Sequence, residues 1–366
     1  MRVEDPEVTL DWEAHLIPEE AGSNGFLDWL CSAVVQGDDG RTYWFGLSPL
    51  ILAHEGRDIW NIEISWNSGS VRQLPGSVYK VAEFPSVDRS NRHVLPAGSL
   101  RVEQGEHEVT VSLGTFRVVC GDDHTWHYTV DDPDAGLSLD FVHRGAGYPT
   151  WYGKEEPSFL TPHSIAYGYN WSGTVEGTLT IDGRPVTFSG KAIRERYVAV
   201  NSSAAEIGGW EDWAWFHFDE AFGSMYEMKL GQKDSSLNLP GRDLFLPSPE
   251  FTIEHEDWAW LPQLGAFIPT RYRVTFQTEA GVLQFTADTV GATVWGVTAT
   301  APSTPVATLN WSELHGTFTD SDGVTIELTN GYGGVSIRQI KPYPDIFGAH
   351  LGALGALEAD GRMTTL

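Results

Sequence analysis

The chain has 366 residues, of which 50 are acidic and 23 are basic, so its formal net charge is −27. This surplus of negative charge repels nucleic-acid phosphates and anionic membrane surfaces, and it excludes both as partners. It also fits an ordinary well-solvated surface, and by itself it indicates no catalytic role.

The composition favours an all-β protein. Hydrophobic residues make up 41% of the chain, which is ample for a large core, and the 39 glycines and 20 prolines indicate many turns. The chain is longer than a typical single domain, so we expect two domains.

The N-terminal stretch MRVEDPEVTLDWEAHL has no apolar segment of the kind found in secretory signals, and no stretch approaches 18 uninterrupted apolar residues. We therefore expect a cytoplasmic protein. Cys31 and Cys120 lie in strand-like apolar surroundings, with no second Cys or His at metal-ligand spacing. Both are predicted to be buried free thiols.

Short runs of alternating β-branched and aromatic residues come next, and each run predicts a strand. The first of them are DWLCSAVV, TYWFGLSPLIL, IWNIEISW, HEVTVSLGTFRVVC, TWHYTVDD and LSLDFVHR. DDG at residues 38–40 and IDGRP at residues 181–185 predict tight hairpin turns, because Asp-Gly accepts the positive φ values that such turns need.

The rest of the chain continues in the same way, with runs such as GTVEGTLTI, VTFSGKAI, WAWFHF, RYRVTFQT, LQFTADT and VTIELT. Roughly sixteen strands result, which is too many for one sandwich. Because one open sheet of that size would expose long edges, we expect two consecutive antiparallel β-barrels, at residues 1–187 and 188–366. The last segment, FGAHLGALGALEADGRMTTL, is predicted to form a short helix or to fray.

The pentapeptide EDWAW occurs twice, at residues 211–215 and 256–260. Alternation along a strand gives the first copy a face of ionisable and indole side chains, namely Glu211, Trp213, Trp215 and His217. The second copy has a similar face, formed by Glu256, Trp258 and Trp260. If both faces line the lumen of one barrel, they form an apolar cavity with a few ionisable groups. The alternative is that the tryptophans only fill the core.

Two stretches in the middle of the chain, GYNWSGTVEGTLTIDGRPVTFSGKAIRERY and WEDWAWFHFDEAFGSMYEMKL, resemble the lipocalin-like family that contains the bacterial carotenoid 1,2-hydratases and the AttH-type proteins. GFLDWLCSAVVQGDDGRTYWFGLSPL near the start, and NWSELHGTF and GVTIELTNGY near the end, agree with this resemblance. The resemblance implies two consecutive lipocalin-like β-barrels or sandwiches. It also implies a hydrophobic substrate, because the family includes hydratases of polyenes, terpenoid cyclases and tandem-lipocalin Diels–Alderases.

The chain departs from this family at one element. Where the hydratases and AttH-type proteins carry Asp-His-x-Trp-Gly, this chain reads Glu195, Arg196, Tyr197, Val198 and Ala199. The acid is kept as Glu195, but the histidine and the tryptophan are missing. The departure counts against simple carotenoid hydration and favours a relative with different chemistry.

Protonating an alkene needs an acid that keeps its proton near neutral pH, and a carboxyl group among indoles has a raised pKa because desolvation disfavours the anion. The candidate acids are Glu195, Glu211, His217 and Glu256. Tryptophan faces can stabilise the resulting cation through cation–π attraction, worth about 2 kcal/mol when desolvated.

A pericyclic ring closure asks only for a rigid apolar cavity and a polarising donor, since orientation can supply most of the rate. The candidate substrate-binding residues are Arg196, Tyr197, Trp213, Trp215, Tyr226, Trp258 and Trp260. Arg196 could hold a polar head such as a carboxylate. The structural alternatives are a cross-strand ion pair for Glu195 or Arg196, and a satisfied structural role for His217.

No cofactor is expected. His124 and His127 lie three residues apart, so on a strand their rings face opposite ways, which argues against a metal site. The sequence has no P-loop, no GxGxxG after a strand and no GxSxG.

The sequence therefore favours a cofactor-independent cyclase or isomerase that acts on a hydrophobic polyene, terpenoid or polyketide in a Trp-lined cavity. Hydration of an isoprenoid double bond and a non-catalytic lipophile carrier are the alternatives. A sugar-binding jelly roll is a further possibility, because tryptophan faces also stack on sugars.

Overall fold

The computed structural model describes residues 9–15, 25–52, 57–76, 79–85, 87–153, 158–161, 164–200, 210–228, 231–263, 266–295 and 307–337. Within these ranges the chain is nearly all β-structure, with one short α-helix, α1 (Leu10–Ala14), and one 3₁₀ turn, η3 (Pro240–Arg242). The all-β prediction is confirmed. The segment 347–366, with its predicted terminal helix or tail, lies outside the described residues.

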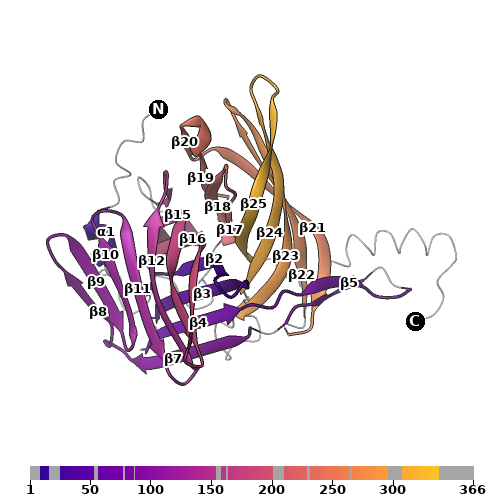
Figure 1. Ribbon diagram of the computed structural model, residues 1–366. Helices are drawn as coiled ribbons and strands as arrows, with labels where there is room; N and C mark the ends of the chain where they lie inside the picture. The colour runs from indigo at the N-terminus through magenta and orange to yellow at the C-terminus, as the bar shows by residue number, and fades with distance from the viewer. Residues whose placement is uncertain are drawn as a thin grey trace.

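The first sheet, sheet A, contains 14 strands in the described part of the chain (Figure 1). Its main path is β7-β4-β3-β1-β16-β15-β12-β11-β10-β9-β8, while β2, β13 and β14 pair off this path. The strands are β1 (Gly25–Asp28), β2 (Cys31–Gly37), β3 (Thr42–Leu52), β4 (Arg57–Ser65), β7 (Arg89–Pro96), β8 (Arg101–Gln104), β9 (Glu108–Leu113), β10 (Phe116–Gly121), β11 (Thr125–Asp132), β12 (Leu137–Gly145), β13 (Thr150–Tyr152), β14 (Ser158–Thr161), β15 (Ser164–Ile181) and β16 (Arg184–Val200).

The second sheet, sheet B, contains 11 strands in the described ranges, in the order β20-β19-β18-β17-β25-β24-β23-β22-β21-β6-β5. The strands are β5 (Ser70–Gln73), β6 (Lys80–Glu83), β17 (Trp210–His217), β18 (Phe222–Met228), β19 (Lys233–Leu239), β20 (Leu244–Pro247), β21 (Glu250–Leu261), β22 (Ala266–Thr278), β23 (Gly281–Trp295), β24 (Ala307–Asp320) and β25 (Thr325–Ile337). Among the described residues, no helix is long and apolar enough to cross a membrane.

Both predicted hairpin turns are confirmed. β15 and β16 form the longest hairpin, and its turn residues Asp182 and Gly183 have φ values of 50° and 78°. β2 and β3 are joined across residues 38–41, where Gly40 has a φ of 81°. Such positive φ values are the ones that Asp-Gly turns accept at low cost.

The expected boundary at residues 187 and 188 falls inside β16, which runs without a break through sheet A. After β16 the chain leaves sheet A between Val200 and Trp210, and the strands that follow, β17 to β25, all belong to sheet B. The first half also contributes the β5–β6 hairpin to sheet B, where Val81 forms a single parallel bridge with Trp260.

Each sheet curls around its own core. In sheet A, the rings of Phe45 on β3 and Phe141 on β12 lie 5.2 Å apart, although several strands separate them within the sheet. In sheet B, the rings of Phe216 on β17 and Phe276 on β22 lie 5.4 Å apart for the same reason. Cys31 and Cys120 are buried free thiols in the core of sheet A, as predicted.

A third group of apolar side chains lies between the two sheets. This inter-sheet cluster consists of Leu30, Val34, Trp44, Ile59, Ala166, Ile193, Tyr197, Ala199, Trp213, Trp215, Tyr226, Met228 and Trp311. Apart from Leu30, which lies between β1 and β2, its members come from β2, β3, β4, β15 and β16 of sheet A and from β17, β18 and β24 of sheet B. The two sheets are thus joined by a layer rich in aromatic rings.

Candidate functional site between the two sheets

The first EDWAW copy alternates along β17 as predicted. Trp213 and Trp215 belong to the inter-sheet cluster, whereas Ala214 and Phe216 belong to the core of sheet B. The tryptophan face therefore points towards sheet A and not into the lumen of its own barrel. Glu211 also lies in β17, but its side chain is outside the described part of the structure.

The second EDWAW copy does not share this layer, so the expectation that four indoles meet in one lumen is wrong. Trp258 and Trp260 are half-buried on β21, where Trp260 packs edge-on against Phe267 at 5.3 Å. Glu256 pairs with Arg273 across strands β21 and β22, with 2.8 Å between Glu256 Oε1 and Arg273 Nη2. Because β21 lies five strands from β17 in sheet B, these side chains face different surroundings.

The two EDWAW copies do meet through other residues, inside sheet B. His255, directly before the second copy, bonds through Nε2 to both carboxylate oxygens of Asp212 at 3.0 Å. The ring of His255 also meets Trp258 and Tyr272 edge-on, at 5.9 and 5.4 Å. The repeated Asp and Trp residues therefore contribute to one buried contact that ties β17 to β21.

Glu195 lies on the face of β16 that looks towards sheet B, opposite Asn170 on β15. With its amide oxygen turned towards Trp213, Asn170 accepts a hydrogen bond from Trp213 Nε1 at 2.8 Å and donates one to Glu195 Oε1 at 3.3 Å. The amide orientation follows from these partners, since only this orientation satisfies both. Glu195 and Trp213, two of the predicted site residues, are thus linked by a residue that sequence reasoning missed.

Asp28 is a second carboxylic acid in this layer. It ends β1, pairs in register with Tyr197 and is 3% exposed, and Ser48 Oγ donates a hydrogen bond to its Oδ1 at 2.7 Å. Burial raises the pKa of Asp28 well above its usual range, and the negative charge of Glu195 adds to the rise. Asp28 therefore holds a proton under conditions in which most carboxyl groups have lost theirs.

Two phenols adjoin the same layer. Tyr197 and Tyr226 are buried members of the inter-sheet cluster. The hydroxyl of Tyr226 donates to Asp234 Oδ2 at 2.5 Å, and Ser158 Oγ lies 3.4 Å from it. Burial and the charge of Asp234 raise the pKa of Tyr226, so this phenol stays protonated as a hydrogen-bond donor.

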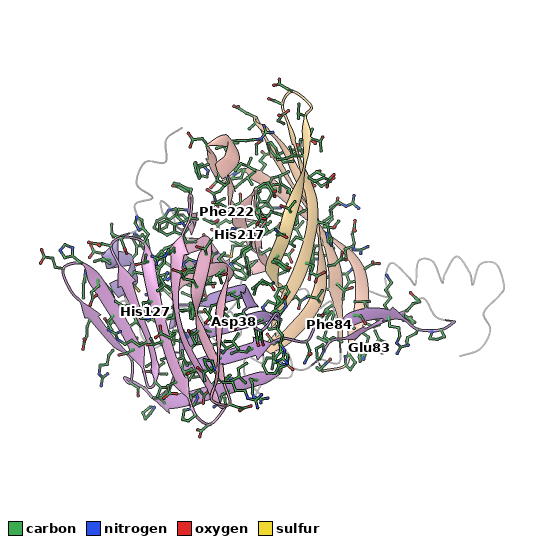
Figure 2. All side chains as sticks on the ribbon, viewed as in Figure 1. Asp38, Glu83, Phe84, His127, His217 and Phe222 are labelled. Atoms are coloured by element: carbon green, nitrogen blue, oxygen red, sulfur yellow. The ribbon has the colours of Figure 1, made fainter. Side chains whose placement is uncertain are left out.

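His217 is buried at the same junction, and its ring lies 4.9 Å from the ring of Phe222 (Figure 2). Burial lowers the pKa of His217 to about 3, and the positive charge of Lys191 adds to the fall. The ring is therefore neutral near pH 7 and holds no imidazolium proton that it could donate. The lowered pKa argues against a role as an acid, and Nδ1 has no hydrogen-bond partner among the described residues, so the ring is not a fully satisfied structural histidine either.

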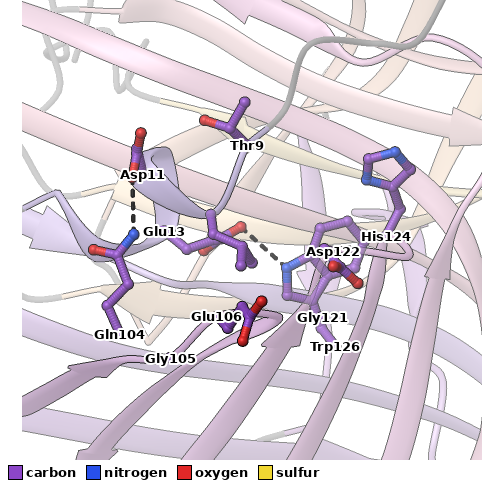
Figure 3. A pocket seen from close by; sticks show the side chains of 11 residues that line it. Thr9, Asp11, Glu13, Gln104, Gly105, Glu106, Gly121, Asp122, His124 and Trp126 are labelled. Carbon is purple, nitrogen blue, oxygen red and sulfur yellow. Dashed lines mark hydrogen bonds between the residues drawn. The ribbon is translucent and has the colours of Figure 1, made fainter.

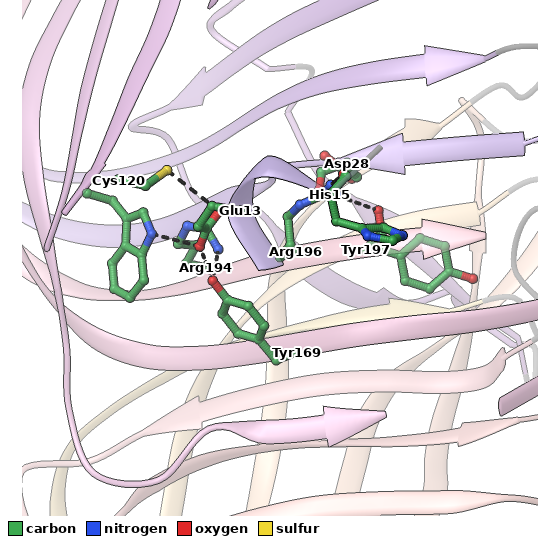
Figure 4. Close-up of polar contacts among 9 residues, drawn as sticks. Glu13, His15, Asp28, Cys120, Tyr169, Arg194, Arg196 and Tyr197 are labelled. Atoms are coloured by element: carbon green, nitrogen blue, oxygen red, sulfur yellow. Dashed lines mark hydrogen bonds and ion pairs between the residues drawn. The ribbon is translucent and has the colours of Figure 1, made fainter. Parts of the chain in front are cut away.

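Arg196 points the other way, into sheet A, and is fully buried (Figure 4). Its guanidinium lies 4.0 Å from the ring centroid of Trp29 and donates to the backbone oxygens of Asp28, Tyr197 and His15. Because these contacts lie within the protein, Arg196 fixes the ends of β1 and β16 in place.

Several buried polar atoms in the layer have no hydrogen-bond partner among the residues that the structure describes. They are Ser32 Oγ, Asn61 Oδ1, Trp215 Nε1 and Trp311 Nε1. An unpaired buried polar group costs about 1–3 kcal/mol, so such groups are normally satisfied by water or by a ligand. These four atoms therefore remain available for hydrogen bonds to water or to a ligand.

Two cavities among the described residues lie elsewhere. One, of about 400 Å³, lies beside α1 and is lined by residues that include Glu13, His124 and Trp126 (Figure 3). The other, of about 590 Å³, lies over the β2–β3 turn and neighbouring parts of β15 and β16. Neither is lined by tryptophans of β17 or β21.

Sequence reasoning overlooked Asp28 and Asn170 because each stands alone in an apolar strand. The sequence does give one signal, since Asp28 is a single acid within the apolar run GFLDWL. Burying a carboxyl group costs free energy, so such a residue indicates a specific role. His124 lies at a tight turn with a φ of 62°, and His127 pairs with Asp140 at 2.6 Å. No group of three or more His, Cys, Asp or Glu side chains in the described ranges could hold a metal ion.

Comparisons with known proteins agree on the fold. No family model and no curated protein matches the chain. A solved protein of Nitrosomonas europaea, provisionally assigned as an AttH, is similar with a TM-score of 0.57 and 14% identity, over 92% of this chain and 98% of that one. CghA is similar with a TM-score of 0.58 and 13% identity, over 88% and 90%. Kievitone hydratase from Nectria haematococca is similar with a TM-score of 0.56 and 11% identity, over 93% of this chain and 95% of that one.

These likenesses span both sheets and nearly the whole of each compared chain. They confirm the resemblance to AttH-like lipocalin-fold proteins and the prediction of two consecutive lipocalin-like units. CghA has also been solved with the small molecule Sch210972, and that structure is similar with a TM-score of 0.53 and 13% identity, over 86% of this chain and 88% of that one. At such low identities the comparisons establish the fold and leave the reaction to be inferred from the side chains.

Proposed function

We propose that this chain is a cofactor-independent enzyme that cyclises or isomerises a hydrophobic polyene, terpenoid or polyketide between its two sheets. The observation that carries the proposal is the buried carboxyl group of Asp28 beside Glu195, next to the aromatic rings of the inter-sheet cluster. Among the solved relatives, kievitone hydratase is by its name an enzyme, and CghA has been solved with a small molecule, which supports an enzyme that acts on a small molecule.

The chemistry follows from the surroundings of the acid. Asp28 donates its proton to a double bond or carbonyl group of the substrate, and the indole faces of the layer stabilise the positive charge that forms. Ring closure or a shift of the double bond then releases a proton, which the Asp28 carboxylate takes back. No atom is gained or lost by the substrate, so no cofactor is needed.

Glu195 acts on this acid through its charge. Its carboxylate opposes ionisation of Asp28, and the hydrogen bond from Asn170 holds it next to Trp213. We therefore treat Asp28 as the proton donor and Glu195 and Asn170 as positioning residues. Trp213, Trp215, Tyr197 and Tyr226 form the wall.

The test incubates the full chain with a panel of linear polyenes, terpenoids and polyketide chains, and follows products by mass spectrometry and binding by tryptophan fluorescence. We expect at least one compound to be converted to a product of unchanged mass. Asp28→Asn should bind that compound as the unchanged protein does and lose turnover by about a hundredfold or more.

Asp132→Asn is the matched control, because Asp132 is a buried aspartate of sheet A that pairs with His93, away from the layer. It should keep its turnover. Full activity in Asp28→Asn would refute the role of Asp28 as the proton donor. A product heavier by one water would identify a hydratase instead, and binding without conversion across the panel would identify a carrier.

A further inference from the structure

Glu13 of α1 is buried inside sheet A, where four donors converge on its carboxylate (Figure 4). Trp126 Nε1 donates to Oε1 at 3.0 Å, and the hydroxyl of Tyr169 donates to the same oxygen. Arg194 forms an ion pair with Oε2 through Nη2, and Cys120 Sγ lies 3.6 Å from it. Both oxygens of the carboxylate are therefore fully engaged.

The donors form a preassembled set that belongs to sheet A alone. Arg194 is fully buried, and its guanidinium lies over the rings of Trp126 and Tyr169, at 4.8 and 5.5 Å from their centroids. Its Nη1 also donates to the Tyr169 hydroxyl at 2.7 Å. These four donors, Cys120, Trp126, Tyr169 and Arg194, form a carboxylate cradle. They come from β10, β11, β15 and β16, so the cradle does not depend on α1 for its shape.

The cradle is built for a carboxylate. A buried guanidinium needs a counter-charge, because an uncompensated ion inside a protein is strongly destabilising. Burial opposes the charge of Arg194, but Glu13 together with the nearby groups of Tyr169, Tyr128 and Cys120 outweighs this effect, so the pKa of the guanidinium is raised. One positive charge matches one carboxylate, whereas a phosphate dianion would leave a second negative charge buried without a partner.

Glu13 is placed in the cradle by a short helix, α1, whose partly buried side chains are apolar. α1 has only five residues and contacts β8, β9 and β10, and its Leu10, Trp12 and Ala14 pack against the core of sheet A. The cavity of about 400 Å³ lies directly beside it and is lined by both α1 and Trp126 (Figure 3). The helix thus presents to sheet A an apolar surface with a single carboxylate.

We propose that the interior of sheet A is a binding site for an amphiphilic carboxylate, a molecule with one carboxylate and an apolar body, and that Glu13 fills the carboxylate position when no ligand is bound. The ligand takes the place of α1 and extends into the cavity beside it. This site is separate from the inter-sheet layer, because Arg194 and Glu195 are on opposite faces of β16.

The first experiment measures binding of the fluorescent polyene acid cis-parinaric acid and of its methyl ester to the full chain. Glu13→Gln removes the internal competitor, so it should bind the acid about tenfold or more tightly than the unchanged protein does. The ester should bind both proteins alike. In Glu13→Gln/Arg194→Met the preference for the acid should vanish.

Asp140→Asn is the control, because Asp140 of β12 is an exposed acid that pairs with His127 at 2.6 Å and does not line the cavity beside α1. It should leave binding of both probes unchanged. A second measurement keeps the test valid if Glu13→Gln fails to fold. Hydrogen exchange of residues 10–14 in the unchanged protein should become faster with the acid and stay constant with the ester.

Equal binding of acid and ester by Glu13→Gln, or unchanged exchange of residues 10–14 at saturating acid, would overturn the proposal. Glu13 and Arg194 would then serve only to fasten α1 to sheet A. Asp28→Asn should keep the preference for the acid, so failure at this site is distinguishable from failure of the proposed enzyme activity.

Discussion

Replacing Glu63 with glutamine should stabilise the protein at neutral and alkaline pH and leave it unchanged in acid. Glu63 lies on β4 near Thr293 of β23, where the two sheets meet. Burial raises its pKa from the usual 4.5 to about 7, and the nearby Thr293 hydroxyl opposes this rise only in part. The folded chain therefore keeps a proton that the unfolded chain releases.

The sign and the size follow from this difference. Between pH 4.5 and about pH 7 the folded chain binds more protons than the unfolded chain, so the free energy of unfolding falls as pH rises. The fall is about 1.4 kcal/mol per pH unit, which gives about 3 kcal/mol in total above pH 7. Glu63→Gln keeps the size and the hydrogen-bonding oxygen of the side chain and lacks the proton, so it avoids this loss.

Urea unfolding of both proteins at pH 4, 6 and 8 measures the effect. The two free energies of unfolding should agree at the lowest pH and differ by about 3 kcal/mol at the highest, in favour of Glu63→Gln. Glu176→Gln, at an exposed carboxyl of β15, should show no such trend. A difference that is independent of pH, or a less stable glutamine variant at pH 8, would refute the reasoning.

The alternation of side chains along a strand correctly assigned Trp213 and Trp215 to one face of β17 and Ala214 and Phe216 to the other. It could not say which core each face contacts. Trp213 and Trp215 face sheet A, while Ala214 and Phe216 face the interior of sheet B. A strand with one wet face reveals its core side through its polar residues. β17 is buried on both faces, so that signal is absent from its sequence.

Local turn chemistry was predictable because it is encoded by two adjacent residues. Asp182 and Gly183 turn β15 into β16 with the positive φ values that the pair favours. The placement of the β5–β6 hairpin in sheet B was not predictable, since it rests on contacts between residues far apart in sequence, such as the bridge between Val81 and Trp260. Alternating polar and apolar residues predict that a strand exists, but they do not predict which distant strand it pairs with.

The polar part of the site was missed for a related reason. Glu13 and Arg194 form a buried ion pair, yet 181 residues separate them, and α1 is too short to show a helical period. The charge of Glu195 raises the pKa of Asp28 across a similar separation in sequence. Sequence spacing can bring residues to one face of one strand, but only the closing of a sheet brings such pairs together.

Two further substitutions test the packing that holds these sites. Gly190→Ala should lower the free energy of unfolding by about 1–3 kcal/mol, because a Cβ there would lie 2.1 Å from the Val34 carbonyl oxygen. Gly241→Ala is the control and should be neutral, because its Cβ would meet nothing within 4 Å. Equal stability of both variants in urea would contradict the close approach of β16 to β2. Asp212→Asn should weaken the buried contact with His255 by about 1.5–3 kcal/mol, because it removes the charged acceptor of a hydrogen bond. A double-mutant cycle with His255→Phe isolates this contact, and a coupling energy near zero would mean that Asp212 does not tie β17 to β21.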